Sequence, residues 1–367
     1  MNKKWTRRDF VRLVAMSAGG AALAACQRAV EPIATATRDA PTPEIARATA
    51  PPVASPVPPP SAIPNATTVA ARPVPITPIK DFYTVSYGQD PSQVPNDWKL
   101  AITGLVDQPL TLSLDDIKAM PAVTEMRTLE CISNTVGGYL ISNGVWKGVR
   151  FKDVLARAGV KPSARYIKLE AYDGLDTSIP LDLGMHEHSL LVYEMNGEPL
   201  PISHGAPLRC LFPGRYGMKQ PKWIQTITLV DSLYRGYWEK QGWSNDAFIL
   251  PNSRIDEPPD NDIVTAPTVT FAGIAFSGAE GIAQVEIVWN DRSDWQETRL
   301  TRGPSPYVWT IWEWTGPAPK PGKHQLSVRV TTNSGKTQTR SEKASMFGEA
   351  FPNGTDKTHS IVIEFRG

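Results

Sequence analysis

Short runs of apolar residues alternate with polar ones from about residue 81 onward, and they predict a protein rich in β-strands. In the later part the runs are short, the alternation is regular, and turn signals separate them. We therefore expect an immunoglobulin-like β-sandwich over 262–367. The predicted strands are 98–106, 125–132, 164–172, 190–195, 207–212 and 222–230, followed by 269–276, 283–289, 324–332 and 359–365.

Two short helices are predicted among the earlier strands. Ser113 followed by Asp116 is typical of a capped helix start, so a helix is expected within 113–120. Residues 151–158 place four apolar side chains on one helical face, and Gly159 ends that helix. Several strands with few helices indicate an α+β domain, which we place at 80–255. The charged, proline-containing stretch after it predicts a linker.

The N-terminus has the pattern of an export signal. Arg7 and Arg8 precede an apolar run that is too short to span a bilayer, as in twin-arginine signals, which carry folded and typically cofactor-loaded proteins. The run ends in LAAC, so residues 1–26 predict a lipoprotein signal with Cys26 as the lipidated residue. A soluble export signal with an incidental cysteine is the alternative. We expect an extracytoplasmic protein that is anchored to a membrane through its lipid.

Residues 27–79 are rich in Pro, Ala, Thr and Val, and they hold much of the chain's total of 34 prolines. Proline removes backbone donors and favours extended chain, so we expect a disordered tether. The whole chain has a formal net charge of +1, with 38 Lys and Arg against 37 Asp and Glu. This balance argues against an electrostatic nucleic-acid binder.

The chain has three cysteines, and two remain once Cys26 is assigned to lipid. A disulfide between Cys131 and Cys210 is one interpretation, because the expected compartment is oxidising. The other is that Cys131, in an open loop of small and polar residues, binds a soft or high-valent metal. His186 and His188 suggest a metal only weakly, because no third ligand accompanies them, and we expect a surface loop there.

Three stretches carry a resemblance to a known family: TLECISN (128–134), VWKGVRFKDVLARAGV (145–160), and YEMNGEPLPISHGAPLRCLFPGRYGMKQPKWI (193–224). They resemble the molybdopterin-binding domain of the sulfite oxidase family, and the C-terminal part is similar to that family's dimerisation domain. The resemblance runs from about Asp81 to the C-terminus. It implies a molybdenum-molybdopterin cofactor, one per chain, with Cys131 as the metal ligand and the catalytic residue. The implied cofactor-binding residues are Cys131, Ser133, Asn134, His204, Arg209, Gly217, Met218, Lys219 and Lys222.

Several positions depart from that family's pattern. Sulfite-oxidising members have an arginine five residues after the cysteine, where this chain has Val136, and another arginine where it has Val85. The next two places hold Ser86 and Tyr87, and the active-site tyrosine falls on Trp243. A dianion such as sulfite loses two cationic partners, and each charge-assisted hydrogen bond contributes about 1.5–3 kcal/mol. A less charged substrate is therefore favoured, unless other cations such as Arg127 or Arg215 reach the pocket.

The resemblance implies an oxidoreductase that catalyses two-electron oxygen-atom transfer, with a sulfur compound as the expected small-molecule substrate. Reduction of an S-oxide is the alternative reaction. A non-enzymatic scaffold lipoprotein is the alternative of another class, which the cysteine argues against. No haem-attachment motif occurs, so we expect no haem and an external electron carrier such as a cytochrome. A homodimer through the C-terminal domain is also implied.

Overall fold

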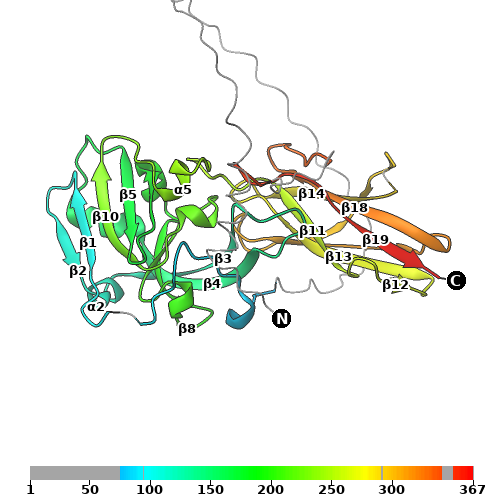
Figure 1. Cartoon of the computed structure of the whole chain (residues 1–367), viewed down its shortest axis with the longest axis horizontal. Helices are drawn as coiled ribbons and strands as arrows, with labels where there is room; N and C mark the ends of the chain where they lie inside the picture. The colour runs from blue at the N-terminus through cyan, green and yellow to red at the C-terminus, as the bar shows by residue number, and fades with distance from the viewer. Residues whose placement is uncertain (1–74, 94, 291, 341–349, 367) are drawn as a thin grey trace, which may run out of the picture.

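The computed structural model describes residues 75–93, 95–290, 292–340 and 350–366. They form two β-rich lobes that lie side by side along the long axis of the molecule (Figure 1), with few and short helices. The predicted export signal, Cys26 and most of the tether lie outside the described residues. No helix in the described ranges is long and apolar enough to cross a membrane.

The first lobe contains a five-stranded sheet in the order β2-β1-β10-β5-β6. Its central strands β1 and β10 run parallel, and the other pairs are antiparallel. The strands are β1 (Leu100–Gly104), β2 (Leu110–Leu112), β5 (Tyr166–Ala171), β6 (Asp176–Pro180) and β10 (Ile224–Val230).

Two helices belong to the core of this lobe, and both lie where the sequence predicts. In α2 (Leu114–Lys118), Ser113 and Asp116 form the reciprocal capping box. In α3 (Phe151–Ala158), the four apolar residues of one face are buried in the same core as the five-stranded sheet. Gly159 ends α3 at φ 69°, a conformation that favours glycine.

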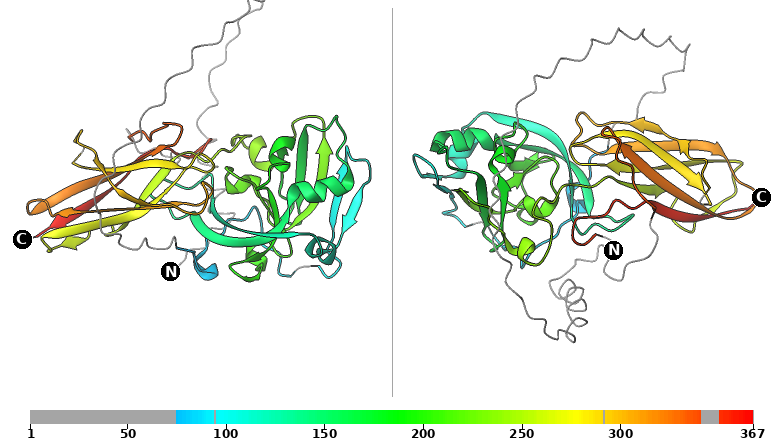
Figure 2. Two further views of the ribbon diagram at one scale, coloured as in Figure 1. Left: turned by 180° about the vertical axis from the view of Figure 1, so that it is seen from behind. Right: turned by 90° about the horizontal axis from the view of Figure 1, so that it is seen from above.

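A second sheet of the first lobe lies on the side that faces the second lobe (Figure 2). Its order is β3-β4-β7-β8, and β9 also pairs with β7. The strands are β3 (Ala122–Glu130), β4 (Ile141–Arg150), β7 (Leu190–Met195), β8 (Glu198–Pro199) and β9 (Arg209–Leu211). The loop between β3 and β4 begins with Cys131. Strand β4 is absent from our sequence predictions, because buried residues follow one another along most of it instead of alternating.

Short elements connect these sheets, and three of them carry side chains to the cavity described below. The short elements are η1 (Ile79–Asp81), α4 (Leu181–Gly184), η2 (Ile202–His204), η3 (Gly217–Lys219) and α5 (Tyr237–Lys240).

The second lobe consists of two sheets that enclose one hydrophobic core. All four strands that the sequence predicts there are present, as β13, β14, β18 and β19. One sheet contains β11 (Asn252–Glu257), β13 (Thr268–Phe276), β17 (Thr310–Pro317) and β16 (Arg299–Thr301). The other contains β12 (Ile263–Val264), β19 (His359–Phe365), β18 (Gly322–Thr332), β14 (Ile282–Trp289) and β15 (Gln296–Glu297).

The border between the lobes differs from the division that the sequence suggests. Strand β11 crosses the expected end of the first domain at residue 255 and pairs with β13 of the second lobe. The expected linker is also fastened to that lobe, because Asn261 N donates to Val362 O at 2.7 Å and Val362 N donates to Asp260 Oδ1 at 2.8 Å. Composition alone does not reveal this attachment, because it depends on contacts with a distant strand.

The last residues of the expected tether are likewise part of the folded chain. Thr77 N donates to Asn143 O at 2.8 Å, and Asn143 Nδ2 donates to Pro75 O at 3.1 Å. Residues 75–79 therefore lie along β4 and lead directly into the cavity-lining segment that follows η1.

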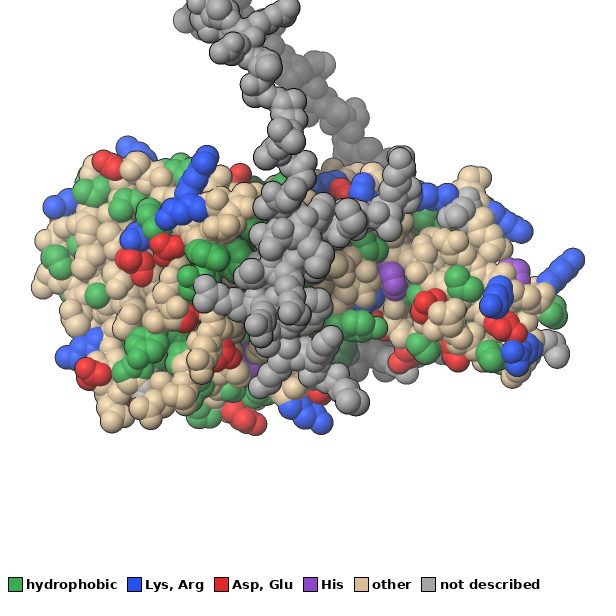
Figure 3. Space-filling model, viewed as in Figure 1, with side chains coloured by type: hydrophobic (Ala, Val, Ile, Leu, Met, Phe, Trp, Pro, Cys, Tyr) green, Lys and Arg blue, Asp and Glu red, His purple; other side chains and the backbone are tan. Residues whose placement is uncertain are grey.

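Basic and acidic side chains are interspersed over the face of the molecule in Figure 3. This mixed distribution agrees with the balanced charge of the sequence.

Candidate cofactor site

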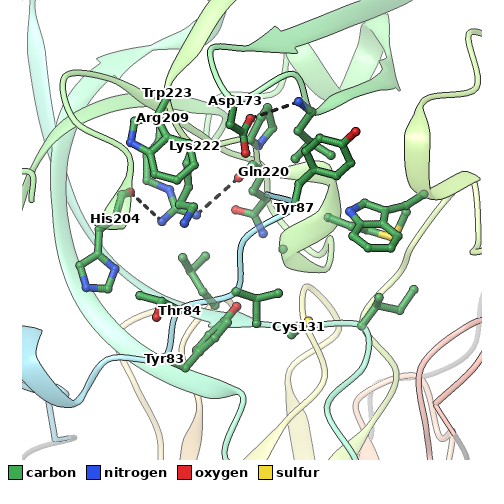
Figure 4. Close-up of a pocket in the computed structure, with 18 of the residues that line it drawn as sticks. Tyr83, Thr84, Tyr87, Cys131, Asp173, His204, Arg209, Gln220, Lys222 and Trp223 are labelled. Carbon is green, nitrogen blue, oxygen red and sulfur yellow. Dashed lines mark hydrogen bonds between the residues drawn. The ribbon is translucent and has the colours of Figure 1, made fainter. Parts of the chain in front are cut away.

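A cavity opens in the first lobe (Figure 4), and its space of about 870 Å³ includes a part that is open to solvent. Five segments far apart in the sequence surround it: the extended stretch after η1, the end of β3 with the loop after it, the turn between β5 and β6, the chain from η2 to β10, and α5 with the residues that follow it. The lining residues are Phe82, Tyr83, Thr84, Val85, Tyr87, Leu129, Cys131, Ile132, Ser133, Asp173, Leu175, Ser203, His204, Arg209, Gly217, Met218, Gln220, Pro221, Lys222, Trp223, Trp238 and Trp243.

Cys131 lies in the cavity wall at the end of β3. Its Sγ is 3.1 Å from the Oγ of Ser133, and its backbone N donates to Leu140 O at 2.9 Å. Burial raises the pKa of the Cys131 thiol, and the hydrogen bonds from Ser133 lower it in part. A bound cation would displace the thiol proton, because thiolate is the ligand form.

Cys131 and Cys210 are both free thiols, so the disulfide interpretation is wrong. Cys210 is fully buried in β9, and burial raises its pKa. Alternation along β9 predicts this core position for Cys210. An apolar, enclosed thiol of this kind is inert.

Arg209 faces Cys131 across the cavity (Figure 4). Its guanidinium donates to two backbone carbonyls, from Nη1 to His204 O at 3.1 Å and from Nη2 to Gln220 O at 3.4 Å. Its Nε is buried without a hydrogen-bond partner, and no ion pair to Arg209 is found among the described residues. Burial lowers the pKa of Arg209 to about 10, which still leaves it charged at neutral pH.

Lys222 is a second cation in the wall, and it is partly compensated. Its Nζ donates to Ser86 Oγ at 2.9 Å and to Ser203 O at 3.1 Å, and lies 3.5 Å from Asp90 Oδ1. Burial lowers the pKa of Lys222 to about 8, although Asp90 acts in the opposite direction.

His204 ends η2 and is almost fully buried. Burial, with the nearby charge of Arg209, lowers its pKa to about 4. The imidazole is therefore neutral near pH 7, and its ring is hydrogen-bonded to the backbone of Ile79. Its ring packs edge-on against Phe82, with a centroid distance of 5.5 Å.

Gly217 and Met218 in η3, and Ser133 beside the cysteine, also line the cavity as predicted. A Cβ atom on Gly217 would come within 3.3 Å of the Tyr83 Oη, which is tighter than ordinary van der Waals contact. Glycine thus keeps the cavity open at this point of the wall.

Lys219 and Asn134, two of the predicted cofactor contacts, do not line the cavity. Lys219 is buried beneath it in an ion pair with Glu239 and also donates to Ser178 O at 2.9 Å. Its charge is already neutralised, so it cannot serve a phosphate. Asn134 Nδ2 donates to Glu130 Oε1 at 2.9 Å, and Asn134 Oδ1 accepts from Leu140 N at 3.0 Å. Asn134 therefore shapes the loop and does not contribute to the cavity wall.

Some of the positions that depart from the family pattern line the cavity, and Val136 does not. Val85 lines the cavity and is 42% exposed, and Tyr87 and Trp243 line it too. Val136 does not line it, and lies in a smaller cavity formed by the cysteine loop and the second lobe.

Neither of the two other arginines considered from the sequence lines the cavity. Arg127 is held by Glu125 at 2.6 Å and donates to His188 O. Arg215 stacks on Phe248, 3.6 Å from the ring centroid. No arginine or lysine besides Arg209 and Lys222 lines the cavity in the described part of the chain.

Several lining residues were not predicted from the sequence. Asp173 sits in the β5–β6 turn, where nothing local marks it as a site residue, and burial raises its pKa. Gln220 braces the wall, because its Oε1 accepts from Phe212 N and its Nε2 donates to Arg215 O. Trp238 and Tyr83 come from segments that meet only in the folded chain. Of these four, Gln220 alone lies inside a motif quoted for the resemblance.

The histidine pair is in a surface loop, as expected. His188 Nδ1 lies 3.0 Å from Glu125 Oε1, and His186 packs near it with a ring-centroid distance of 5.6 Å. The described residues contain no group of three or more His, Cys, Asp or Glu that could hold a metal ion.

The residues present fit a molybdopterin. Arg209 supplies a buried, uncompensated charge with an unpaired N–H, which suits an anionic phosphate. Cys131 supplies a soft ligand in the same cavity, and Gly217 leaves room for a close approach. The fold and site together define a molybdopterin-binding oxidoreductase.

Comparisons with known proteins agree with this class. Residues 87–238 match the family model "Oxidoreductase molybdopterin binding domain". The chain is 40% identical over 158 residues to the uncharacterized oxidoreductase YuiH of Bacillus subtilis (strain 168), which covers 41% of this chain and 78% of that protein. It is 30% identical over 304 residues to the mitochondrial sulfite oxidase of Homo sapiens, which covers 69% of this chain and 55% of that protein. The chain belongs to the sulfite oxidase family of molybdopterin-dependent oxidoreductases.

A solved structure shares the fold. The sulfane dehydrogenase SoxCD from Paracoccus pantotrophus superposes with a TM-score of 0.69 at 21% identity, over 80% of this chain and 84% of that chain. The chain spans about half the length of the mammalian sulfite oxidases it matches, 55% in the human case.

Proposed function

We propose that the protein catalyses two-electron oxygen-atom transfer on a sulfur compound that carries little negative charge. Electrons would be exchanged with an external carrier such as a cytochrome. The observation that carries this proposal is the composition of the cavity: its two cations lie across from Cys131, and the remaining wall includes Val85, Tyr87, Trp243 and the carboxylate of Asp173.

The cofactor would be held at two places. Cys131 would ligate molybdenum through its thiolate, and Arg209, Lys222 and His204 would bind the phosphate and pterin. When bound, the group supplies the two-electron redox chemistry of its metal. The protein would supply orientation and charge: Arg209 and Lys222 would balance the phosphate, and neutral His204 would border the cofactor without adding a third charge.

The charges of the cavity wall determine which substrates it favours. Arg209 and Lys222 are committed to the cofactor in this arrangement, so no further cation in the described lining faces a substrate dianion. Two missing charge-assisted hydrogen bonds weaken dianion binding by several kcal/mol, at about 1.5–3 kcal/mol each. Aromatic and aliphatic walls instead favour a neutral or singly charged sulfur compound, because specificity follows the matching of charge to charge. Reduction of an S-oxide is the second candidate, since the same walls accept a neutral S-oxide.

The test uses purified, molybdenum-loaded enzyme. Sulfite and neutral sulfides are assayed with an artificial electron acceptor, and neutral S-oxides with a reduced dye. We expect kcat/KM to favour a neutral compound over sulfite by about a hundredfold or more, which corresponds to the two missing charge-assisted bonds. Efficient oxidation of sulfite at a micromolar KM would contradict the substrate proposal. The variant Val85→Arg is the matched gain-of-charge control, and it should improve sulfite binding. Because the chain is an oxidoreductase of this family, the scaffold alternative is no longer needed.

We also propose that the chain is exported and lipid-anchored. Arg7 with Arg8 and the LAAC stretch support this assignment. Replacing both arginines by lysine should retain the protein in the cytoplasm, because the export receptor reads the arginine pair and not the charge alone. Cys26→Ala should release the mature protein from the membrane. Unchanged membrane localisation of both variants would reject the assignment.

The second lobe is proposed to be an immunoglobulin-like module through which two copies pair, and the first lobe to be the catalytic domain. The alternating strands and the two enclosing sheets support the module assignment. Sedimentation of the purified protein measures its oligomeric state directly. A monomer at all accessible concentrations would reject the dimer.

A further inference from the structure

The loop that carries Cys131 contacts the second lobe at three places. It runs from β3 to β4 and is closed by Asn134, whose backbone N donates to Cys131 O and whose side chain binds Leu140 N. The closed loop then rests on β11 and β19, strands that contribute nothing to the cavity wall.

The first contact is a hydrogen bond between Glu130 and Asn252. Glu130 precedes Cys131 directly and is 3% exposed, and its Oε2 accepts a hydrogen bond from Asn252 Nδ2 of β11 at 2.9 Å. Its other oxygen accepts from Asn134 Nδ2, also at 2.9 Å. The carboxylate thus joins the loop to itself with one oxygen and to the second lobe with the other.

The second and third contacts hold the middle of the loop. Arg254 of β11 donates from Nη1 to Gly138 O at 2.8 Å, and its guanidinium lies 4.8 Å from the ring centroid of Tyr139. The ring of His359 in β19 packs on Gly137, where an added Cβ would come closer to the ring than any real Cβ contact. His359 Nδ1 in turn accepts from Ile255 N at 3.1 Å, which fixes the ring to β11.

We propose that Asn252, Arg254 and His359 are positioning residues for Cys131, so that the second lobe sets the place of the cysteine in the cofactor cavity. Ile132 buries one end of the loop in a hydrophobic cluster, and the contacts from a rigid sheet hold the remainder, where small residues leave little core. The inference rests on the proposed role of Cys131 as the metal ligand.

The first experiment breaks and then rebuilds the Glu130–Asn252 hydrogen bond in the full-length protein. Asn252→Leu removes the donor and leaves a buried carboxylate oxygen unpaired. The double variant Glu130→Gln with Asn252→Asp exchanges donor and acceptor: the introduced glutamine can accept from Asn134 and donate to the introduced carboxylate. Thr298→Val is the control, because it removes a buried hydrogen bond of the second lobe, from Thr298 Oγ1 to Val285 O, away from the loop.

Two readouts separate positioning from general stability. Hydrogen exchange of the amides at 133–140 should become roughly tenfold or more faster in Asn252→Leu, should return toward the parent value in the double variant, and should not change in Thr298→Val. The electronic absorption and reduction potential of the molybdenum centre should follow the same order. Unchanged exchange and spectrum in Asn252→Leu, or a double variant no better than the single, would overturn the proposal.

The second experiment uses two glycines with similar positive φ angles, where an alanine would be strained to a similar degree. Gly137 has φ 68° and Gly197 has φ 83°, but nothing lies within 4 Å of a Cβ added at Gly197. Gly137→Ala should displace the loop and alter the metal spectrum, and Gly197→Ala should not. Adding His359→Ala to Gly137→Ala should restore part of the parent spectrum by making room. Equal effects of both alanine variants would count against the contact with His359.

The dependence on the proposed function is checked with Cys131→Ser. If this serine variant kept the parent metal spectrum, the ligand assignment would be wrong. The exchange measurement would still decide on its own whether the second lobe holds the loop.

Discussion

The guanidinium of Arg209 is suited to hold a bound anion. Arg209 is 6% exposed, its two hydrogen bonds go to backbone carbonyls, and its Nε has none. Enclosing a charge without a counter-charge is costly, and such groups in folded proteins are normally paired. The protein without its cofactor therefore bears an electrostatic cost that an anionic phosphate would relieve.

Cys131→Ser is predicted to abolish turnover and change the molybdenum spectrum while leaving much of the pterin bound. Arg209, Lys222 and His204 line the opposite side of the cavity from the sulfur, so they can hold the cofactor independently of it. Activity, spectrum, and the molybdenum and pterin content of the purified variant are measured together. Full turnover with serine in place would disprove the ligand assignment.

Lys222 is predicted to make cofactor retention depend on pH. Burial lowers its pKa to about 8, below its ordinary value of 10.5, and an anionic partner would raise it again. Retention should therefore be strongest below pH 8 and weaken above it, by up to about tenfold in affinity for each pH unit. The pH dependence is measured as the release of pterin from the purified protein at pH values below and above that pKa. Lys222→Arg is the control and should remove the trend, because arginine stays charged.

The same shift predicts the opposite trend for the cofactor-free protein. The folded state disfavours protonated Lys222, so the unfolded chain binds more protons between about pH 8 and 10.5. The free energy of unfolding should then rise as pH increases through that window. Denaturant titrations of cofactor-free protein at several pH values provide the check. The absence of a rise in the parent, relative to Lys222→Met, would contradict the assigned burial.

At the scale of elements, periodicity and capping identified ten of the nineteen strands in the described residues and both longer helices. These features depend on neighbours along the chain, as the capping box at Ser113 and the buried face of α3 do. The assignment of β11 could not be predicted in this way. Its hydrogen-bond partner is β13 of the second lobe, and pairing between strands is decided by tertiary contacts.

The same limit applies to the site. Lys219 and Lys222 are three residues apart in one motif and look equivalent in sequence. The structure buries Lys219 against Glu239 and directs Lys222 into the cavity wall. Burial and partner decide the difference, and neither can be read from a residue's own position. The resemblance grouped Arg209, His204 and Cys131 because they occupy matching places in the family's motifs, and all three line the cavity.

The Lys219–Glu239 ion pair is predicted to lock η3 to α5 under the cavity. Lys219 also donates to Thr177 Oγ1 at 3.1 Å, and both charged side chains are nearly inaccessible. Lys219→Met should lower the free energy of unfolding by about 3–5 kcal/mol, because it leaves a buried carboxylate without its partner. Combining it with Glu239→Leu should recover much of the loss. Denaturant unfolding of the parent, the two single variants and the double variant measures the coupling, and additive losses would exclude it.

At the scale of the whole molecule, the two lobes share a hydrophobic cluster. Its members from the first lobe are Ile132, Ile141, Tyr216, Met218, Trp243, Ala247 and Ile249, and those from the second lobe are Ile274, Phe276, Val308 and Trp309. Thr128 adds hydrogen bonds across the same border, because its N donates to Tyr307 O and its Oγ1 accepts from Trp309 N. The lobes are therefore joined through a common core and not by a flexible connection.

This shared core predicts one cooperative unfolding transition for the full chain. Separating the lobes would expose large apolar side chains, which stabilises each lobe against unfolding alone. Calorimetry should give a single peak, and Phe276→Ala should shift the whole peak downward, at a cost of about 3–5 kcal/mol. Two resolved peaks, with only one moved by Phe276→Ala, would show independent lobes.

Three of the chain's 11 tryptophans, Trp223, Trp238 and Trp243, line the cofactor cavity. Indole emits in the near ultraviolet, where pterins absorb, so a pterin bound in this cavity would quench that emission. The cavity thus contains its own optical reporter. Cofactor loading, release and exchange could be followed in real time by intrinsic fluorescence, without a label and without substrate turnover.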